Sequence, residues 1–95
     1  MGASKLVVID LTASDTNLFE TYERKVLPLL SLYDGKLELS VRSMDGATEI
    51  HALYFPDEMS FDAFMSDPSR IALKDELRHT GATSTISDVE QVNYL

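Results

Sequence analysis

Short runs of apolar and β-branched residues predict four β-strands. The first is expected at Lys5–Thr12, the second at Lys36–Ser43, the third at Ala47–Phe55 and the last at roughly Ile86–Tyr94. Asp45-Gly46, between the second and third runs, is a strong hairpin signal. The first run and the later half of the third are apolar at both odd and even positions, which indicates that both of their faces are covered.

Helical spacing predicts a helix after the first strand. Apolar residues recur at intervals of three and four over residues 18–33, and Asn17 with Glu20 forms a capping box at its start. Pro28 lies inside this pattern and predicts a kink or a break, because proline has no backbone N–H to donate. Gly35 is expected to end the helix in the left-handed conformation.

A second helical region follows the third strand. Pro56 cannot donate to a sheet ladder and stops the strand, and Asp57 is then placed to cap a short helix. Asp67-Pro68 predicts a new helix start, with a cap followed by a proline at the first helical position, and this helix is expected to run to Arg78.

The resulting order βαββαβ predicts an α+β, ferredoxin-like fold with a four-stranded antiparallel sheet whose first and third strands are central. Two helices cover only one face of such a sheet. The side chains expected under the helices are Leu6, Val8, Asp10, Ile50, Ala52 and Tyr54. Those expected on the helix-free face are Val7, Ile9, Leu11, Leu53 and Phe55.

An apolar face without helices needs a partner, and a second copy of the chain is the simplest one. We therefore expect a homodimer through the helix-free sheet faces, in which residues 1–95 form a single domain of a dimeric α/β barrel. Leu53→Asp is expected to dissociate or unfold this dimer, because it buries an unpaired charge.

Composition limits the function classes. The 95 residues include 16 acidic and 8 basic side chains, giving a net charge of -8, which repels phosphate backbones and argues against nucleic acid as a partner. The absence of cysteine excludes disulfides and thiolate metal sites and fits a cytoplasmic location. No stretch approaches the ~18 apolar residues of a membrane span, so no membrane association is expected.

A small-molecule ligand is expected in a mainly apolar pocket between the helices and the sheet. The candidate ligand-binding residues are Asp10, Tyr22, Tyr54, Phe64 and His79. Asp10 would be a pocket carboxylate with a raised pKa, and Tyr54 would direct its hydroxyl to the same cavity. The alternatives are a strand-end acid that reaches water, core aromatic residues, and a histidine that complements the negative end of its helix.

Glu49-x-His51 places a carboxylate and an imidazole on one face of the third strand. The pair could begin a metal site, but further histidine or cysteine ligands are lacking. We expect His51 to be an ordinary hydrogen-bonded histidine in or beside the dimer interface, and the protein to bind neither a metal nor another cofactor.

Several short motifs follow one another along the chain. They are Phe19-x-x-Tyr22, Val26-x-Pro28-Leu29-Leu30, Tyr33-Asp34-Gly35-Lys36, Phe55-Pro56, Phe64, and Ser66-Asp67-Pro68 before a helix that ends at Arg78. This series, over about Lys5 to Tyr94, resembles a family of small uncharacterised bacterial proteins. They are dimeric α/β barrels, distantly related to antibiotic-biosynthesis monooxygenase domains.

The resemblance implies the same fold and dimer, and it carries two differences in chemistry. Haem-degrading relatives place a haem-ligating histidine where this chain has Leu73, so no haem is expected. Cofactor-independent oxygenase relatives use an asparagine on the first strand and a tryptophan at the end of the third, where this chain has Asp10 and Tyr54.

Three functions remain open from the sequence. The first is a small-molecule-binding protein with a mainly apolar pocket. The second is a cofactor-independent monooxygenase, isomerase or lyase acting on small aromatic or lactone substrates. The third is a dimeric scaffold without a ligand.

Overall fold

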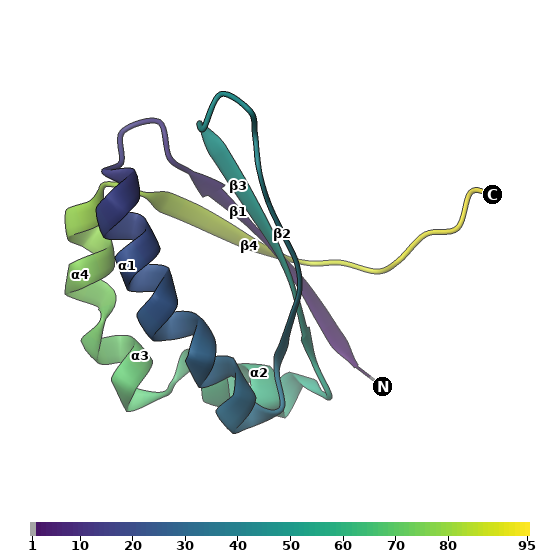
Figure 1. Cartoon of the computed structure of the whole chain (residues 1–95). Helices are drawn as coiled ribbons and strands as arrows, with labels where there is room; N and C mark the ends of the chain where they lie inside the picture. The colour runs from purple at the N-terminus through teal and green to yellow at the C-terminus, as the bar shows by residue number, and fades with distance from the viewer. Residues whose placement is uncertain (1) are drawn as a thin grey trace.

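The computed structural model describes residues 2–95, in which all helices lie on one face of a four-stranded antiparallel sheet (Figure 1). The strands are β1 (Ala3–Asp10), β2 (Lys36–Arg42), β3 (Thr48–Phe55) and β4 (Thr83–Asp88), in the order β2-β3-β1-β4. The helices are α1 (Thr16–Val26), the 3₁₀ helix η1 (Leu27–Tyr33), α2 (Glu58–Met65), α3 (Pro68–Ala72) and α4 (Lys74–Thr80). The predicted ferredoxin-like order and the central position of β1 and β3 are confirmed.

The first helical segment changes its geometry where proline was predicted to interrupt it. The α-helical part ends at Val26 and continues as the tighter η1, with Pro28 in its first turn. The predicted capping box is wrong: the side chain of Asp15, rather than Asn17, accepts a hydrogen bond from the Leu18 amide at 3.1 Å.

The end of η1 differs from the prediction in a similar way. Asp34, not Gly35, adopts the left-handed conformation, with a φ of 57°. Gly35 is needed for a different reason, since a Cβ there would lie 2.8 Å from the Phe55 ring and 3.1 Å from the Leu30 carbonyl. The glycine therefore lets the start of β2 approach the core closely.

The caps of the second helical region are confirmed. The Asp57 side chain accepts from the Ser60 amide at 2.7 Å at the start of α2, and Asp67 accepts from the Arg70 amide at 3.0 Å at the start of α3. Pro68 occupies the first turn of α3, where its missing N–H costs nothing.

The last strand begins earlier than the sequence suggested. β4 starts at Thr83 and ends at Asp88, whereas the prediction was roughly Ile86–Tyr94. Residues 89–95 belong to no helix or strand and extend away from the body of the molecule (Figure 1). Among residues 2–95, no helix is long and apolar enough to cross a membrane.

The predicted assignment of sheet faces is reversed in the structure. The side chains expected on the helix-free face lie in the hydrophobic core under the helices: Val7, Ile9, Leu11, Leu53 and Phe55. The open face carries the residues that were expected inside: Leu6, Val8, Asp10, Ile50, Ala52 and Tyr54. Since β1 has apolar residues at both odd and even positions, its sequence pattern does not determine which face meets the helices.

Polar residues under the helices explain why the reversal was hard to foresee. Lys5 is 3% exposed and faces α2, where its ammonium group donates to Glu58 at 2.8 Å and also pairs with Asp88. These hydrogen bonds, first the one to Asp88 and then the one to Glu58, raise the pKa of Lys5 and keep it charged. Glu49 and His51 are buried on the same face. Polar side chains of this kind ordinarily indicate an outer surface.

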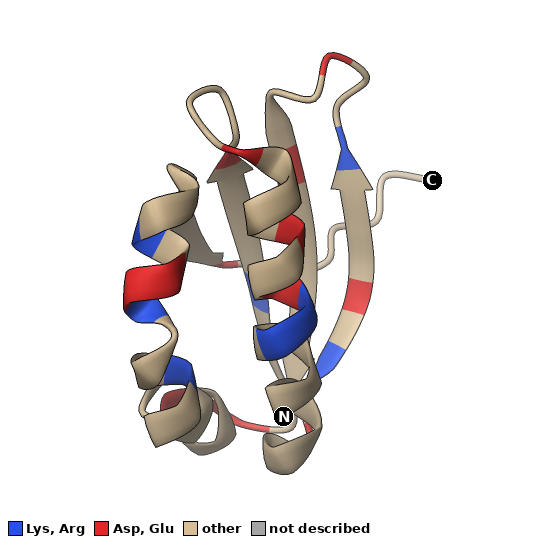
Figure 2. Cartoon of the chain, turned by 60° about the vertical axis from the view of Figure 1, so that its left-hand side comes forward, with Lys and Arg blue, Asp and Glu red and all other residues tan. Residues whose placement is uncertain are grey.

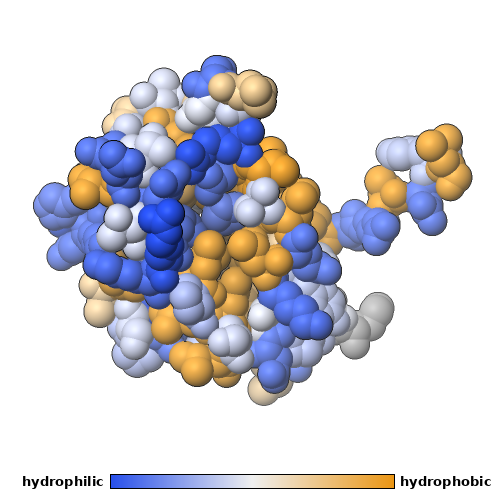
Figure 3. Space-filling view, in the orientation of Figure 1, coloured by the Kyte–Doolittle hydropathy of each residue, from blue (hydrophilic) through white to orange (hydrophobic). Residues whose placement is uncertain are grey.

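The open face of the sheet is mainly apolar and has no helix over it. A register shift between Leu37 and Leu39 turns Leu39 and Val41 of the edge strand β2 toward this face, where they pair with Ala52 and Ile50. Leu39 and Val41 remain 51% and 47% exposed, and Figure 3 shows hydrophobic surface over β2.

Phe55 is the most deeply buried side chain of the core and contacts the rings of Phe61 and Phe64, with centroids 5.4 and 5.6 Å away. Phe55→Ala removes this packing and should lower the free energy of unfolding by about 3–5 kcal/mol. Met59→Ala, at an 80% exposed position of α2, is the control and should change it little. Denaturant unfolding measures both, and equal small effects would contradict this description of the core.

Candidate functional site

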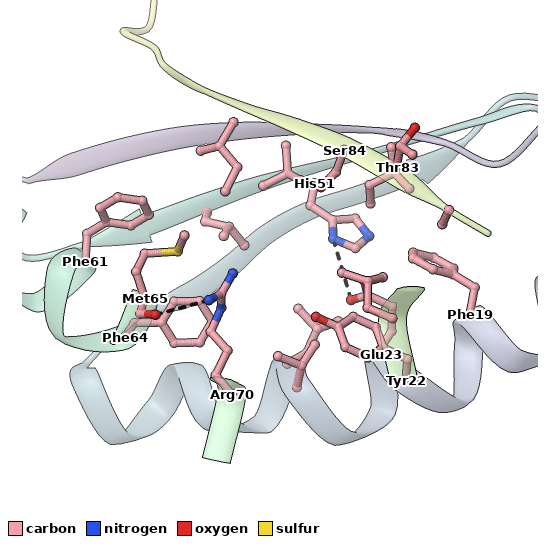
Figure 4. Close-up of a pocket in the computed structure, with 18 residues that line it drawn as sticks. Phe19, Tyr22, Glu23, His51, Phe61, Phe64, Met65, Arg70, Thr83 and Ser84 are labelled. Atoms are coloured by element: carbon pink, nitrogen blue, oxygen red, sulfur yellow. Dashed lines mark hydrogen bonds and ion pairs between the residues drawn. The ribbon is translucent and has the colours of Figure 1, made fainter. Parts of the chain in front are cut away.

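A cavity of about 90 Å³ lies between the helical layer and the sheet (Figure 4). Its volume is several times the ~10–15 Å³ that admit one water molecule, so it has room for a small organic molecule. Most of its walls are apolar, contributed by Val7, Ile9, Phe19, Val26, Leu53, Phe61, Phe64, Met65 and Leu77. The polar side chains that reach it include Tyr22, Glu23, His51 and Arg70.

His51 projects from the centre of β3 toward α1 (Figure 4). His51 is 4% exposed, and its Nε2 lies 2.7 Å from a carboxylate oxygen of Glu49, two residues earlier on the same strand face. A carboxylate only accepts, so Nε2 carries the proton in this contact, and a ring with a single proton then has its lone pair on Nδ1. Nδ1 faces Glu23, whose nearest oxygen is 3.9 Å away.

Glu49 is held in place by an arginine from the neighbouring strand. Arg42 donates from Nε at 2.8 Å to one oxygen of Glu49, while the other oxygen binds His51. The same guanidinium binds Glu20 of α1 at 3.0 Å. These contacts raise the pKa of Arg42, and the hydrogen bond that it donates to Glu49 is the first cause. A continuous chain of charged groups thus joins β2, β3 and α1 behind the histidine.

Glu23 is the unusual acid of this group. Its side chain is only 15% exposed, and burial, together with the negative charge of Glu49, raises the pKa of Glu23 to about 7. In α1 the acidic positions precede the basic ones, whereas in α4 acidic and basic positions are interspersed (Figure 2). Glu23 can therefore gain or lose a proton near neutral pH.

The arrangement can transfer a proton to or from a bound molecule. The imidazole of His51 is fixed in orientation by Glu49, with Nδ1 toward the cavity, and the raised pKa of Glu23 is about 7. Both groups border the same apolar space, where a bound compound would lose most of its contact with water. Burial also raises the pKa of the neighbouring Tyr22.

Asp10 and Tyr54, two of the five sequence-predicted site residues, lie on the open face of the sheet and away from this cavity. Asp10 is exposed at the end of β1 and accepts hydrogen bonds from the Thr12 hydroxyl at 2.5 Å and amide at 2.9 Å. These contacts lower the pKa of Asp10, contrary to the predicted rise. Tyr54 is half-buried on the open face beside Gly2, where an added Cβ would collide with its ring. Their predicted positions are wrong because the sheet faces are reversed.

The other three predicted residues, Tyr22, Phe64 and His79, all lie on helices. Tyr22 and Phe64 border the cavity, Tyr22 from α1 and Phe64 from α2. His79 is exposed on α4, and its Nδ1 lies 2.7 Å from the Asp75 carbonyl of the same helix. It therefore complements the end of the helix and does not reach the cavity.

Sequence reasoning missed Glu23 and placed His51 on the wrong side of the sheet. The signal for Glu23 was present: it lies four residues after Phe19 and three before Val26, inside the buried stripe of α1. An acid within an apolar helical stripe is a candidate for a buried titrating group. Within residues 2–95, no group of three or more potential ligands is arranged to hold a metal ion.

Glu23→Gln tests the raised pKa through stability. Ionising Glu23 costs folded-state free energy because its folded pKa, about 7, exceeds the ordinary value of 4.5. Its stabilising contribution is present below the ordinary pKa and is lost as pH rises through the folded pKa. Relative to wild type, the variant should gain up to about 3 kcal/mol at about pH 8 and far less at about pH 5.

Denaturant unfolding at both pH values, with exposed Glu38→Gln on β2 as the control, measures this difference. An identical pH dependence for wild type and Glu23→Gln would show that Glu23 titrates as an ordinary surface acid.

Comparison with known proteins supplies no family assignment but identifies shared folds. No protein-family model matches the sequence, and no curated protein matches it. Among solved structures, SnoaB, a cofactor-independent oxygenase from Streptomyces nogalater, superposes with a TM-score of 0.80 at 14% sequence identity, covering 99% of this chain and 96% of that chain.

NIPSNAP proteins are similar as well. One of unknown function from Agrobacterium tumefaciens has a TM-score of 0.69 at 14% identity, covering 99% of this chain and 93% of that chain. An uncharacterised NIPSNAP domain protein from Burkholderia xenovorans has a TM-score of 0.70 at 12% identity, covering 100% and 98%. At these identities the likeness establishes the fold, and the chain therefore has the ferredoxin-like fold of SnoaB and the NIPSNAP proteins.

Proposed function

We propose that the protein binds a small, mainly apolar molecule in the cavity between helices and sheet and moves a proton on it. The observation that carries this proposal is the contact of His51 with Glu49 in the wall of an apolar cavity, with Glu23 opposite. A buried carboxylate–imidazole pair such as Glu49 and His51 is a costly choice for stability alone, because well-packed apolar residues serve at least as well. Its position at a cavity supports a role in chemistry.

In this proposal His51 Nδ1 accepts a proton from an acidic O–H or C–H of the bound compound. Glu49 stabilises the resulting imidazolium through the hydrogen bond at Nε2. Glu23, when protonated, can return a proton to another position of the same compound. The apolar walls exclude water and hold the compound against the pair. Proton transfer by these groups requires no metal or other cofactor.

Two reaction types share this step, and the fold favours the first. Removal of a proton produces an electron-rich anion, from which a reaction with molecular oxygen can start. SnoaB, which has the same fold, is described as a cofactor-independent oxygenase. The same anion could instead be reprotonated elsewhere or expel a leaving group, as in an isomerase or a lyase. Oxygen consumption distinguishes the two types.

The test uses 4-nitrophenol, whose ionised form absorbs in the visible range. The wild-type protein should bind it and increase the ionised fraction at a pH where the free compound is mainly neutral, because His51 takes up the proton. His51→Gln should leave the bound compound un-ionised. His79→Gln, which changes the exposed histidine of α4, is the matched control and should behave as wild type.

If the protein binds 4-nitrophenol without increasing its ionised fraction, His51 has no acid–base role and the protein is only a binding protein. No binding of any small aromatic compound in the cavity would overturn the proposal in favour of a scaffold without a ligand.

We also propose that the open sheet face packs against the same face of a second copy. The face presents Leu6, Val8, Leu39, Val41, Ile50 and Ala52. A two-fold interface pairs an apolar patch with itself, which suits these uncharged side chains. An interface of the ordinary class would bury more than ~1,000 Å² in total.

Val41→Asp should convert this dimer to a folded monomer, because it places a charge within the apolar contact. The matched control is Leu32→Asp at a 68% exposed position of η1, which should stay dimeric. Light scattering at micromolar concentration measures the masses, and a monomeric wild type would contradict the dimer.

A further inference from the structure

The cavity contains a charged group that proton transfer by His51 and Glu23 leaves unused. Arg70, in α3, directs its guanidinium into the space beside Phe64 (Figure 4). Its backbone amide is fixed by the Asp67 cap, its Nη1 donates to the Met65 carbonyl at 3.1 Å, and its guanidinium carbon lies 5.5 Å from the Phe64 ring centroid. Backbone contacts and packing thus hold the side chain in one direction.

Arg70 differs from the other three arginines of the chain in having no carboxylate partner among residues 2–95. Arg24 and Arg42 pair with Glu20, and Arg78 pairs with Asp75. A chain with 16 acidic and 8 basic side chains offers many possible partners. A guanidinium presents five N–H donors in a planar fork that matches a carboxylate, and the contact with Met65 engages only one nitrogen.

We propose that the cavity binds a small organic anion, an aromatic or conjugated carboxylate of about one ring, whose carboxylate pairs with Arg70. The opposite end of the molecule then lies toward His51 and Glu23, and its apolar body lies against Phe19, Val26 and Leu53. The cavity volume of about 90 Å³ limits the ligand to this size. This inference rests on the proposed function, since it names the class of compound to which His51 and Glu23 would transfer a proton.

The surrounding charges permit an anion at this position. Glu49 is compensated by Arg42, and Glu23 is largely neutral below about pH 7. The net charge of -8 disfavours anions at long range, but salt screens that field beyond ~10 Å, whereas Arg70 contacts the ligand directly. Anion binding should therefore weaken as pH rises through about 7 and Glu23 ionises.

The experiment compares 4-hydroxybenzoate with its neutral isostere 4-hydroxybenzamide by calorimetric titration. Wild type should bind the benzoate at least about tenfold more tightly, the discrimination that one charge-assisted pair supplies. Arg70→Gln should remove this preference while retaining the amide affinity. Arg78→Gln, on the exposed surface of α4, is the matched control and should keep it.

Arg70→Lys provides a second variant if Arg70→Gln fails to fold, and it should reduce the preference without abolishing it, because lysine keeps the charge but loses the fork. Equal affinities of wild type for the two compounds, or a preference that survives Arg70→Gln, would overturn the inference that the ligand is an anion. The proposed binding cavity and proton transfer by His51 and Glu23 would be unaffected. Absence of binding by both compounds and by 4-nitrophenol would instead overturn the proposed function as well.

Discussion

The hydrogen bond between Glu49 and His51 is the interaction on which the rest of the site depends. It fixes the protonated nitrogen of His51, directs the other nitrogen toward Glu23, and continues through Arg42 to Glu20. Three elements, α1, β2 and β3, are joined by this chain, so the position of α1 over the sheet and the geometry of the cavity are set together. The apolar walls strengthen the electrostatic interactions of the charged groups that face the cavity, because little water screens them.

The element order was predictable because its signals are local. Asp57 and Asp67-Pro68 mark helix starts through their own hydrogen bonds, and the structure has helices beginning at both. Asp45-Gly46 likewise marks a hairpin within four residues of chain, and Gly46 has the positive φ of 75° that such a turn requires. Each of these signals acts within a few residues and does not depend on the rest of the fold.

The orientation of the sheet could not be predicted from the same kind of signal. β1 is apolar on both faces, so the decision depends on long-range partners: Glu58 and Asp88 for Lys5, and Arg42 for Glu49. Without these partners, Lys5 and His51 look like surface residues and Leu6 and Val8 look like core. The predicted site was wrong for the same reason. Asp10 and Tyr54 lie on the same sheet face as Leu6, which the helices do not cover. Glu23 and His51 come together only because α1 covers the opposite face.

The central claim is that a small aromatic compound binds between α1 and β3, beside the proton pair, and not on the open sheet face. The most direct measurement is the bromine anomalous difference map from a crystal of the protein soaked in 4-bromophenol. We expect a bromine peak within the cavity, among the apolar walls that include Phe19, Val26 and Phe64, with the phenol oxygen toward His51 and Glu23. A peak only on the open face near Val8 and Asp10, or no peak in an accessible cavity, would contradict it.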